Sequence, residues 1–260
     1  MAEPSVAFDR AADFYDQTRG FPAGEEHHVA HMVAQAGNFE KDSSLLEIGV
    51  GTGRIALPVS AYVAAYIGVD LSRPMMNKLR GKHNSQDIYL AEADATRLPF
   101  GEATFDGTVV SHVFHLIPNW QTALTELRRV LRPDAPLVHI WSKDEGVFHP
   151  LWDAWNNALP AQAETTYGVP WRTQPNYLED EGWRPNGEAL THLLTGQTSL
   201  QKFLDQVKER IWSSCWRYTD GEMARGMAAM EAVIPNVFPE RETPINTSTT
   251  VYARAYLPPR

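Results

Sequence analysis

The chain has 260 residues, a hydrophobic fraction of 43% and a formal net charge of −9. Its length suits one large domain, or one domain with a helical addition. Nucleic-acid binding depends on clustered Lys and Arg that neutralise phosphates, so an acidic chain without a basic run disfavours DNA or RNA as a partner. No apolar run approaches the roughly 18 residues of a membrane span. Because the N-terminus lacks a signal-peptide pattern and Cys215 is the single cysteine, we expect a cytoplasmic protein.

Residues 1–42 are expected to form a helical segment ahead of the main domain. Apolar residues from Phe8 to Tyr15 share one face at helical spacing. His27 and His31 stand four residues apart, as they would on a metal-binding helix. No third ligand follows at a recognised spacing, so no metal site is predicted.

A strand, a glycine-rich turn and a helix follow in close succession. The apolar residues 45–48 predict a buried strand, and the pattern E-x-G-x-G-x-G runs from Glu47 to Gly53. Glycine has no Cβ, so the backbone of such a turn can approach a ligand closely. A phosphate-binding P-loop requires Lys and Ser/Thr where Arg54 and Ile55 stand. A dinucleotide fingerprint requires a third glycine at the position of Arg54.

Two further strands are predicted at residues 66–70 and 88–92. The first of them ends in Asp70, and a carboxylate at the end of the second strand of a doubly wound fold can bind ribose hydroxyls. Asp94 follows the next strand. Glu47 would repel a pyrophosphate but tolerate a ligand that carries an ammonium and a sulfonium group.

This series of motifs resembles the class I (Rossmann-like) S-adenosylmethionine (SAM) dependent methyltransferases. E-x-G-x-G-x-G resembles their motif I, and "LPF…FD" from Leu98 to Asp106 resembles the lead into their fourth strand. The resemblance covers about residues 45–141 and is closest to Methyltransf-11-type small-molecule methyltransferases, near uncharacterised bacterial members. The segment Phe8–Arg19 resembles the N-terminal lid of such enzymes, "F-D-x-x-A-x-x-Y-D-x-x-R".

The resemblance implies SAM as the cofactor and S-adenosylhomocysteine as its product. It places a tyrosine and an arginine of the lid near the methionine carboxylate, the acid after the third strand on the adenine amino group, and the next backbone amide on the adenine ring. Leu71 would stack against the adenine. The predicted cofactor-binding residues are Tyr15, Arg19, Glu47, Gly49, Gly51, Gly53, Asp70, Leu71, Asp94, Ala95 and Ser111.

His112 and His115 are the candidate catalytic residues, because they follow the fourth strand at the expected cleft. Methyl transfer is an in-line displacement, and holding donor and acceptor in alignment supplies much of its acceleration. A general base is needed only when the nucleophile is protonated, and histidine has a suitable pKa for it. The alternative, packing beside the cofactor, stays open for both and is favoured for His115 by the resemblance.

The predicted fold class is α/β, with a seven-stranded, mainly parallel sheet and helices on both faces. The last two strands are expected near residues 189–194 and 249–256. Four parts are expected: an N-terminal helical lid (1–42), a SAM-binding core (43–141), a helical insertion after the fifth strand that covers the substrate (142–187), and the C-terminal part of the core sheet with its helices (188–260).

Aromatic residues crowd the expected insertion. They favour an aromatic or hydrophobic acceptor, although small helical additions also need bulky anchors to pack. These residues are Trp152, Trp155, Tyr167, Trp171, Tyr177 and Trp183.

The sequence thus predicts a SAM-dependent methyltransferase that acts on a small molecule, as a monomer or homodimer. Oxygen, nitrogen and carbon acceptors stay open. The alternatives are a non-catalytic SAM-binding protein and an NAD-dependent oxidoreductase, the latter disfavoured by Arg54.

Overall fold

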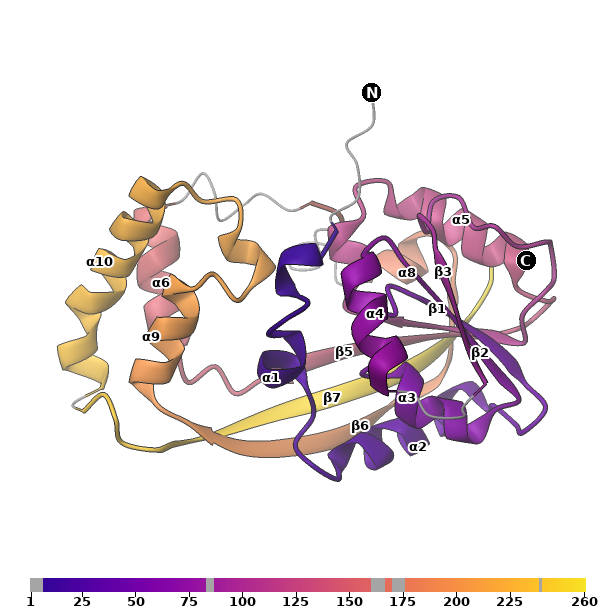
Figure 1. The fold of residues 1–260 in the computed structure, drawn as a ribbon, viewed down its shortest axis with the longest axis horizontal. Coiled ribbons are helices and arrows are strands. Elements are labelled where there is room, and N and C mark those ends of the chain that lie inside the picture. The colour runs from indigo at the N-terminus through magenta and orange to yellow at the C-terminus, as the bar shows by residue number, and fades with distance from the viewer. Residues whose placement is uncertain (1–6, 83–86, 160–166, 170–175, 239) are drawn as a thin grey trace. The chain divides into compact units, whose positions relative to one another are not determined.

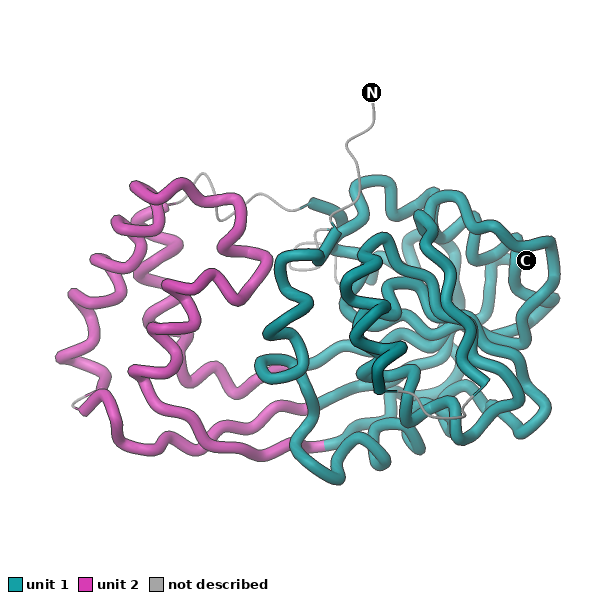
Figure 2. The backbone as a smooth tube through the Cα atoms, in the orientation of Figure 1, with its two compact units in different colours: residues 1–142, 166–192, 251–260 teal, residues 143–165, 193–250 magenta. Residues whose placement is uncertain are grey.

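The computed structural model describes residues 7–82, 87–159, 167–169, 176–238 and 240–260. It contains two compact units (Figure 2). Unit 1 comprises residues 1–142, 166–192 and 251–260, and unit 2 comprises residues 143–165 and 193–250. Within the described ranges, no helix has the length and apolarity needed to cross a bilayer.

A seven-stranded sheet runs through the fold in the order β3-β2-β1-β4-β5-β7-β6 (Figure 1). Parallel pairing joins β3 to β2, β2 to β1, β1 to β4 and β4 to β5. This confirms the predicted α/β class with a mainly parallel sheet. The strands are β1 (Ser44–Ile48), β2 (Ala65–Asp70), β3 (Ile88–Glu92), β4 (Gly107–Ser111), β5 (Leu137–Asp144), β6 (Arg184–Thr198) and β7 (Ile245–Leu257).

The strand order reverses beside β1, and the position of this reversal indicates where a ligand can bind. From β1 the chain moves outward through β2 and β3, then returns to β4 on the other side of β1. In open α/β sheets, ligands bind outside the carboxyl ends of the strands at such a reversal. The loops after β1, β2, β3 and β4 therefore surround the expected site.

The helices alternate with the strands of the first half of the chain and cluster in the second half. Short 3-10 turns (η) accompany them. These elements are η1 (Asp9–Ala11), α1 (Tyr15–Arg19), α2 (Glu25–Gly37), α3 (Ala56–Val59), η2 (Ser60–Tyr62), α4 (Arg73–Lys82), η3 (Phe114–Leu116), α5 (Trp120–Val130), α6 (His149–Ala158), α8 (Tyr177–Asp180), α9 (Leu200–Lys208), η4 (Ser213–Cys215) and α10 (Asp220–Val237).

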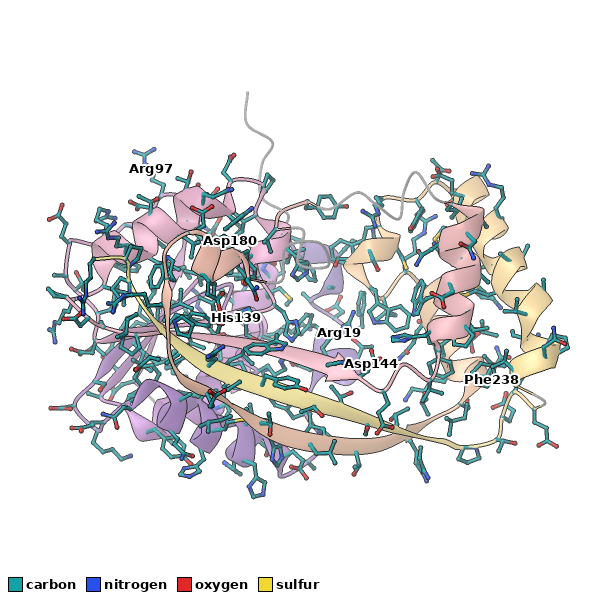
Figure 3. All side chains as sticks on the ribbon, turned by 180° about the vertical axis from the view of Figure 1, so that it is seen from behind. Arg19, Arg97, His139, Asp144, Asp180 and Phe238 are labelled. Carbon is teal, nitrogen blue, oxygen red and sulfur yellow. The ribbon has the colours of Figure 1, made fainter. Side chains whose placement is uncertain are left out.

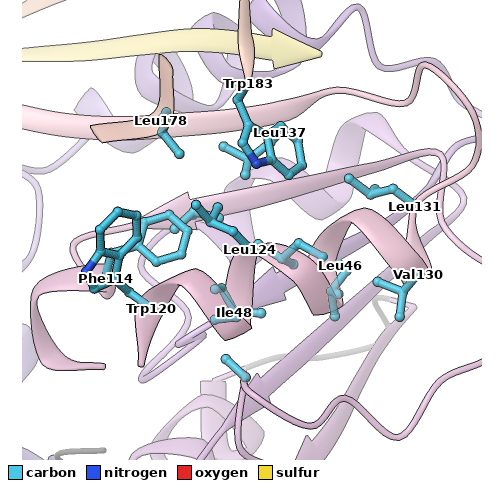
Figure 4. Close-up of a cluster of buried hydrophobic side chains, with 14 of the residues drawn as sticks. Leu46, Ile48, Phe114, Trp120, Leu124, Val130, Leu131, Leu137, Leu178 and Trp183 are labelled. Carbon is cyan, nitrogen blue, oxygen red and sulfur yellow. The ribbon is translucent and has the colours of Figure 1, made fainter. Parts of the chain in front are cut away.

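The core of unit 1 forms where α5 packs against the sheet (Figure 4). The buried face of α5, formed by Leu124, Leu127 and Val130, is at most 3% exposed. It meets the apolar side chains of β1 and β5, including Leu46 and Leu137. This burial of apolar surface is the main force that stabilises the sheet and its helices.

The core of unit 2 is a separate apolar cluster drawn from α6, α9 and α10. Trp155 of α6 is fully buried there, and a Cβ on Gly226 of α10 would lie 2.3 Å from its ring. Ser199 caps α9, because its side chain accepts a hydrogen bond from the backbone N–H of Lys202. Met223 and Met230 of α10 belong to the same cluster and Met227 packs against it, since flexible methionine side chains fill gaps in a core.

The structure divides the chain differently from the expected insertion at 142–187. Tyr177, Leu178 and Trp183 pack into the core of unit 1, whereas Trp155 packs into the core of unit 2. Residues 193–250, expected as part of the main domain, belong to unit 2. The reason is packing: Tyr177 and Trp183 anchor their segment to the core of unit 1, whereas Trp155 anchors α6 to the core of unit 2. Trp171 lies outside the described residues.

One buried histidine helps to fix this arrangement in unit 1. His139 of β5 (Figure 3) lies with its Nε2 3.0 Å from the hydroxyl of Tyr177 in α8. Burial lowers the pKa of His139 to about 4, so its ring is neutral near pH 7. The contact ties α8 to the sheet.

Candidate cofactor site

The turn after β1 has a backbone that only glycine adopts readily. Gly49, Gly51 and Gly53 have φ values of +71°, +54° and +81°. A Cβ on Gly49 would lie 2.6 Å from Val113, and one on Gly53 would lie 2.3 Å from Leu79. The alternating glycines therefore serve two needs, a left-handed turn and close packing against α4 and the loop after β4.

Asp70 holds this turn from the end of β2. Its Oδ2 accepts a hydrogen bond from the Gly51 N–H at 2.8 Å, and its Oδ1 accepts one from the Ser72 N–H at 2.8 Å. Burial raises the pKa of Asp70, although these N–H donors favour the charged form. Each carboxylate oxygen has a second lone pair, so Asp70 can accept further bonds from a ligand while it holds the turn.

A cleft in unit 1 opens at the carboxyl ends of β1 to β4. It contains about 680 Å³ of empty space, part of which is open to solvent. Two aspartates and no Lys or Arg stand among the described residues that line it. The lining comprises Phe8, Tyr15, Gly49, Gly51, Val69, Asp70, Leu71, Met75, Ala93, Asp94, Ala95, Ser111, His112, Val113, Leu116 and Ile117.

The loop after β3 brings a second carboxylate to the cleft. Oδ1 of Asp94 accepts bonds from both the N–H and the hydroxyl of Thr96, at 2.9 and 2.8 Å. These bonds fix the orientation of the side chain, as in a typical Asx turn. The recorded hydrogen bonds of Asp94 in the described chain use Oδ1, which leaves Oδ2 for a donor on a ligand.

The N-terminal segment contributes aromatic side chains to the same cleft. Tyr15 lines it as predicted, and Phe8 packs edge-on against Tyr15 with ring centroids 6.3 Å apart. Phe8 lies on the apolar helical face noted in the sequence, but its contact with the cleft was not predicted. Six other lining residues, all apolar, were also missed, because their sequence signal does not differ from that of ordinary core residues.

Four predicted site residues do not line the cleft: Arg19, Glu47, Gly53 and His115. Glu47 lies beneath the turn, 2% exposed, and accepts a hydrogen bond from the Tyr66 hydroxyl at 2.9 Å. Burial raises the pKa of Glu47 to about 8, so its neutral form predominates at pH 7. The charge pairing expected between Glu47 and a cationic ligand requires an ionised carboxylate, whereas this environment favours the protonated acid.

His112 lines the cleft, directly after β4, in a left-handed conformation with φ of +50°. Its Nε2 lies 3.4 Å from the Ser142 hydroxyl oxygen. Desolvation and then the cation of Arg54 lower the pKa of His112 well below its usual value. Desolvation and the cation of Arg19 lower the pKa of His115 to about 4. Both rings are therefore neutral at pH 7 and have a nitrogen that can accept a proton.

Two histidines of α2 lie beside aromatic rings of other elements in unit 1, His28 beside His192 and His31 beside Tyr62. His28 stacks on His192, with centroids 5.2 Å apart, and His192 Nε2 lies 2.5 Å from Glu25 Oε2. Among the residues that the structure describes, no group of three or more potential ligands could hold a metal ion.

The chemistry of the cleft fits SAM better than a dinucleotide. SAM carries a positive sulfonium and no phosphate, and the described lining residues include two carboxylates, one at the end of β2 and one just after β3, and no Lys or Arg. A pyrophosphate would have to lie beside these two carboxylates. Arg54 is not among the lining residues, although its Nη2 donates to the hydroxyl of the lining residue Ser111 at 3.4 Å.

Comparisons with known proteins agree with SAM as the ligand of this chain. A family model described as "Methyltransferase domain" matches residues 46–139. Demethylmenaquinone methyltransferase from Streptomyces avermitilis is 28% identical over 205 residues, which cover 70% of this chain and 86% of that protein.

Solved structures show the same fold. A candidate type II methyltransferase from Anaeromyxobacter dehalogenans has a TM-score of 0.63 at 16% identity, over 93% of this chain and 98% of that one. Phosphoethanolamine N-methyltransferase 2 from Haemonchus contortus, solved with S-adenosylhomocysteine, has a TM-score of 0.53 at 15% identity, over 97% of this chain and 58% of that one. The matched domain and the relatives support a SAM-dependent methyltransferase that acts on a small-molecule acceptor, and the solved structures share the α/β fold of this chain.

Proposed function

We propose that the cleft of unit 1 binds SAM through Asp70, Asp94 and the glycine turn, and presents its methyl group to a small aromatic or hydrophobic acceptor. The observation that carries this proposal is the pair of aspartates at the ends of neighbouring parallel strands, both lining one cleft beside a left-handed turn. The Streptomyces avermitilis relative, named for a quinone substrate, supports an acceptor of this class.

Each residue has a role that follows from its position. Asp70 accepts from the ribose hydroxyls with the lone pairs that its backbone bonds leave unused. Asp94 accepts from the adenine amino group through Oδ2, the Ala95 N–H meets the adenine ring, and Leu71 packs on the ring. Bound SAM supplies an electrophilic methyl group on a sulfonium, which leaves as a neutral thioether.

The remaining residues act on the acceptor and on water. Tyr15 and Phe8 cover the cleft and exclude water from it. His112 accepts the proton when the acceptor is a phenol, an alcohol or a protonated amine, because its ring is neutral and lies at the cleft wall. Whether the protein works as a monomer or a homodimer stays a prediction.

Titration calorimetry tests the cofactor assignment. We expect the purified protein to bind S-adenosylhomocysteine, and NADH to neither bind nor raise the melting temperature. A screen of phenols, amines and carboxylic acids should then find an acceptor that releases S-adenosylhomocysteine from SAM. Binding of NADH alone would favour an oxidoreductase. Cofactor binding with no acceptor methylated across the screen would favour a non-catalytic SAM-binding protein.

His112→Asn is expected to reduce kcat for an acceptor with a protonated nucleophile by about tenfold. This is below the usual 10²–10⁴-fold contribution of a proton-transfer group, because a lowered pKa makes a weaker base. Asn suits the left-handed backbone at this position. The Kd of S-adenosylhomocysteine should change less than threefold, roughly the scale of a weak contact.

His115→Asn is the matched control, since His115 carries a similar neutral ring but does not line the cleft. We expect it to retain the wild-type kcat. A loss of kcat in the His115 variant and not in the His112 variant would reverse the assignment.

A further inference from the structure

The N-terminal segment reaches the glycine turn through one short hydrogen bond. The Thr52 hydroxyl donates to Asp16 Oδ1 at 2.6 Å, and Thr52 is only 1% exposed. The other oxygen of Asp16 accepts from Lys82 Nζ at 2.9 Å. Hydrogen bonds to an ionised acceptor are shorter and about twice as strong as neutral ones. Asp16 thus joins α1 both to the turn and to the last residue of α4.

The position of this bond relates it to the cleft. Thr52 follows Gly51, whose N–H is held by Asp70, so two carboxylates from different elements fix adjacent residues of the turn. Asp16 follows Tyr15, whose side chain lines the cleft. Displacing Asp16 from Thr52 would therefore move Tyr15 away from the same turn that the cofactor contacts.

We propose that Asp16 is a positioning residue whose hydrogen bond to Thr52 latches the N-terminal segment over the cofactor cleft and sets how long the cofactor stays bound. This inference rests on the proposed function of the cleft. The family resemblance assigns roles to Tyr15 and Arg19 in this segment but none to Asp16 or Thr52.

The chain contains a natural control for this latch. Asp13 lies on the same segment and forms an ion pair with Lys78 of α4, Oδ1 to Nζ at 2.8 Å. The side chain of Asp13 is 92% exposed, and its recorded partner is on α4 rather than on the turn. Exposed ion pairs of this kind contribute little. If the segment were held by charge attraction to α4, both Asp13 and Asp16 would contribute, since each pairs with a lysine of α4. If it is held by the bond to Thr52, Asp16 contributes and Asp13 does not.

The test measures association and dissociation rates of S-adenosylhomocysteine on the full chain by stopped-flow fluorescence. Asp16→Ala and Thr52→Val should each raise the dissociation rate about tenfold, the scale of one lost hydrogen bond to a charged group. The double variant should match Asp16→Ala, because Thr52→Val removes a bond that Asp16→Ala already removes. Thr52→Ser should restore the wild-type rate, and Asp13→Ala should stay within about twofold of it.

A second measurement follows the latch without any ligand. Trypsin cleavage after Arg10 or Arg19 should be about tenfold faster in Asp16→Ala than in the wild type, at equal melting temperature, because cleavage tracks the open population. Unchanged dissociation and cleavage rates in a folded Asp16→Ala protein would overturn the latch, as would an equal effect of Asp13→Ala. Failure of the wild-type protein to bind S-adenosylhomocysteine would contradict the proposed function, and the cleavage rates would still test the latch.

Discussion

Replacing Asp70 with Ala is expected to weaken the binding of S-adenosylhomocysteine by about 10- to 150-fold, or about 1.5–3 kcal/mol, as for hydrogen bonds to a charged group. The variant removes the acceptor proposed for the ribose hydroxyls. It also leaves the Gly51 N–H without the carboxylate that holds it at 2.8 Å, so the turn loses an anchor beside the cofactor. We therefore expect a loss near the upper end of this range, measured by calorimetry at constant pH.

Two variants help to separate the two effects of losing Asp70, the loss of the ribose acceptor and the loss of the anchor of the turn. Asp70→Asn keeps the size of the side chain and one acceptor oxygen, so its loss should be smaller. Ser72→Ala removes the side chain that caps α4 through the Met75 N–H at 3.3 Å, without touching the turn. If Ser72→Ala weakened binding as much as Asp70→Ala, the effect would come from α4. Unchanged affinity in a folded Asp70→Ala protein would refute the ribose assignment.

The parts of the fold that depend on local patterns were predictable from the sequence. The third strand was predicted at the residues where β3 forms, Ile88–Glu92. The glycine turn was predictable because its spacing is itself the structural requirement. The loops after β1, β2 and β3 then had to converge, since parallel strands end at one edge of a sheet.

Features that depend on long-range contacts were not predictable in this way. The sequence shows Glu47 as an acid near the end of a strand, but its partner Tyr66 lies on the neighbouring strand, 19 residues further along the chain. The bond between Asp16 and Thr52 spans 36 residues. Likewise, an aromatic residue in a proline-rich stretch gives no sign of which core it will enter, as Trp155 and Trp183 show.

The pH dependence of stability provides a test of the buried Glu47. Its folded-state pKa is raised from 4.5 to about 8, so between these values the folded protein holds a proton that the unfolded chain releases. This contribution is fully present below pH 4.5 and is lost as the pH rises to about 8; at 1.36 kcal/mol per unit it amounts to roughly 5 kcal/mol. The buried histidines have the opposite effect: with lowered pKa values, they cost stability as the pH falls below about 6.5.

Glu47→Gln separates the contribution of Glu47 to the pH dependence of stability from that of the histidines. Glutamine resembles the protonated acid and can still accept from the Tyr66 hydroxyl, so the variant should lose the Glu47 contribution to the pH dependence and keep the others. In urea unfolding, the stability of the wild type relative to the variant should fall by about 2 kcal/mol from pH 6 to pH 8.

The same variant decides between the two positions considered for this carboxyl group. If Glu47 lies beneath the turn as a neutral acid, Glu47→Gln should bind S-adenosylhomocysteine about as tightly as the wild type, since Glu47 does not line the cleft. A parallel pH dependence of the two proteins, together with a more than tenfold loss of affinity, would show instead an ionised Glu47 that faces the cofactor. That outcome would restore the charge pairing expected from the sequence and would require the turn to open toward β1.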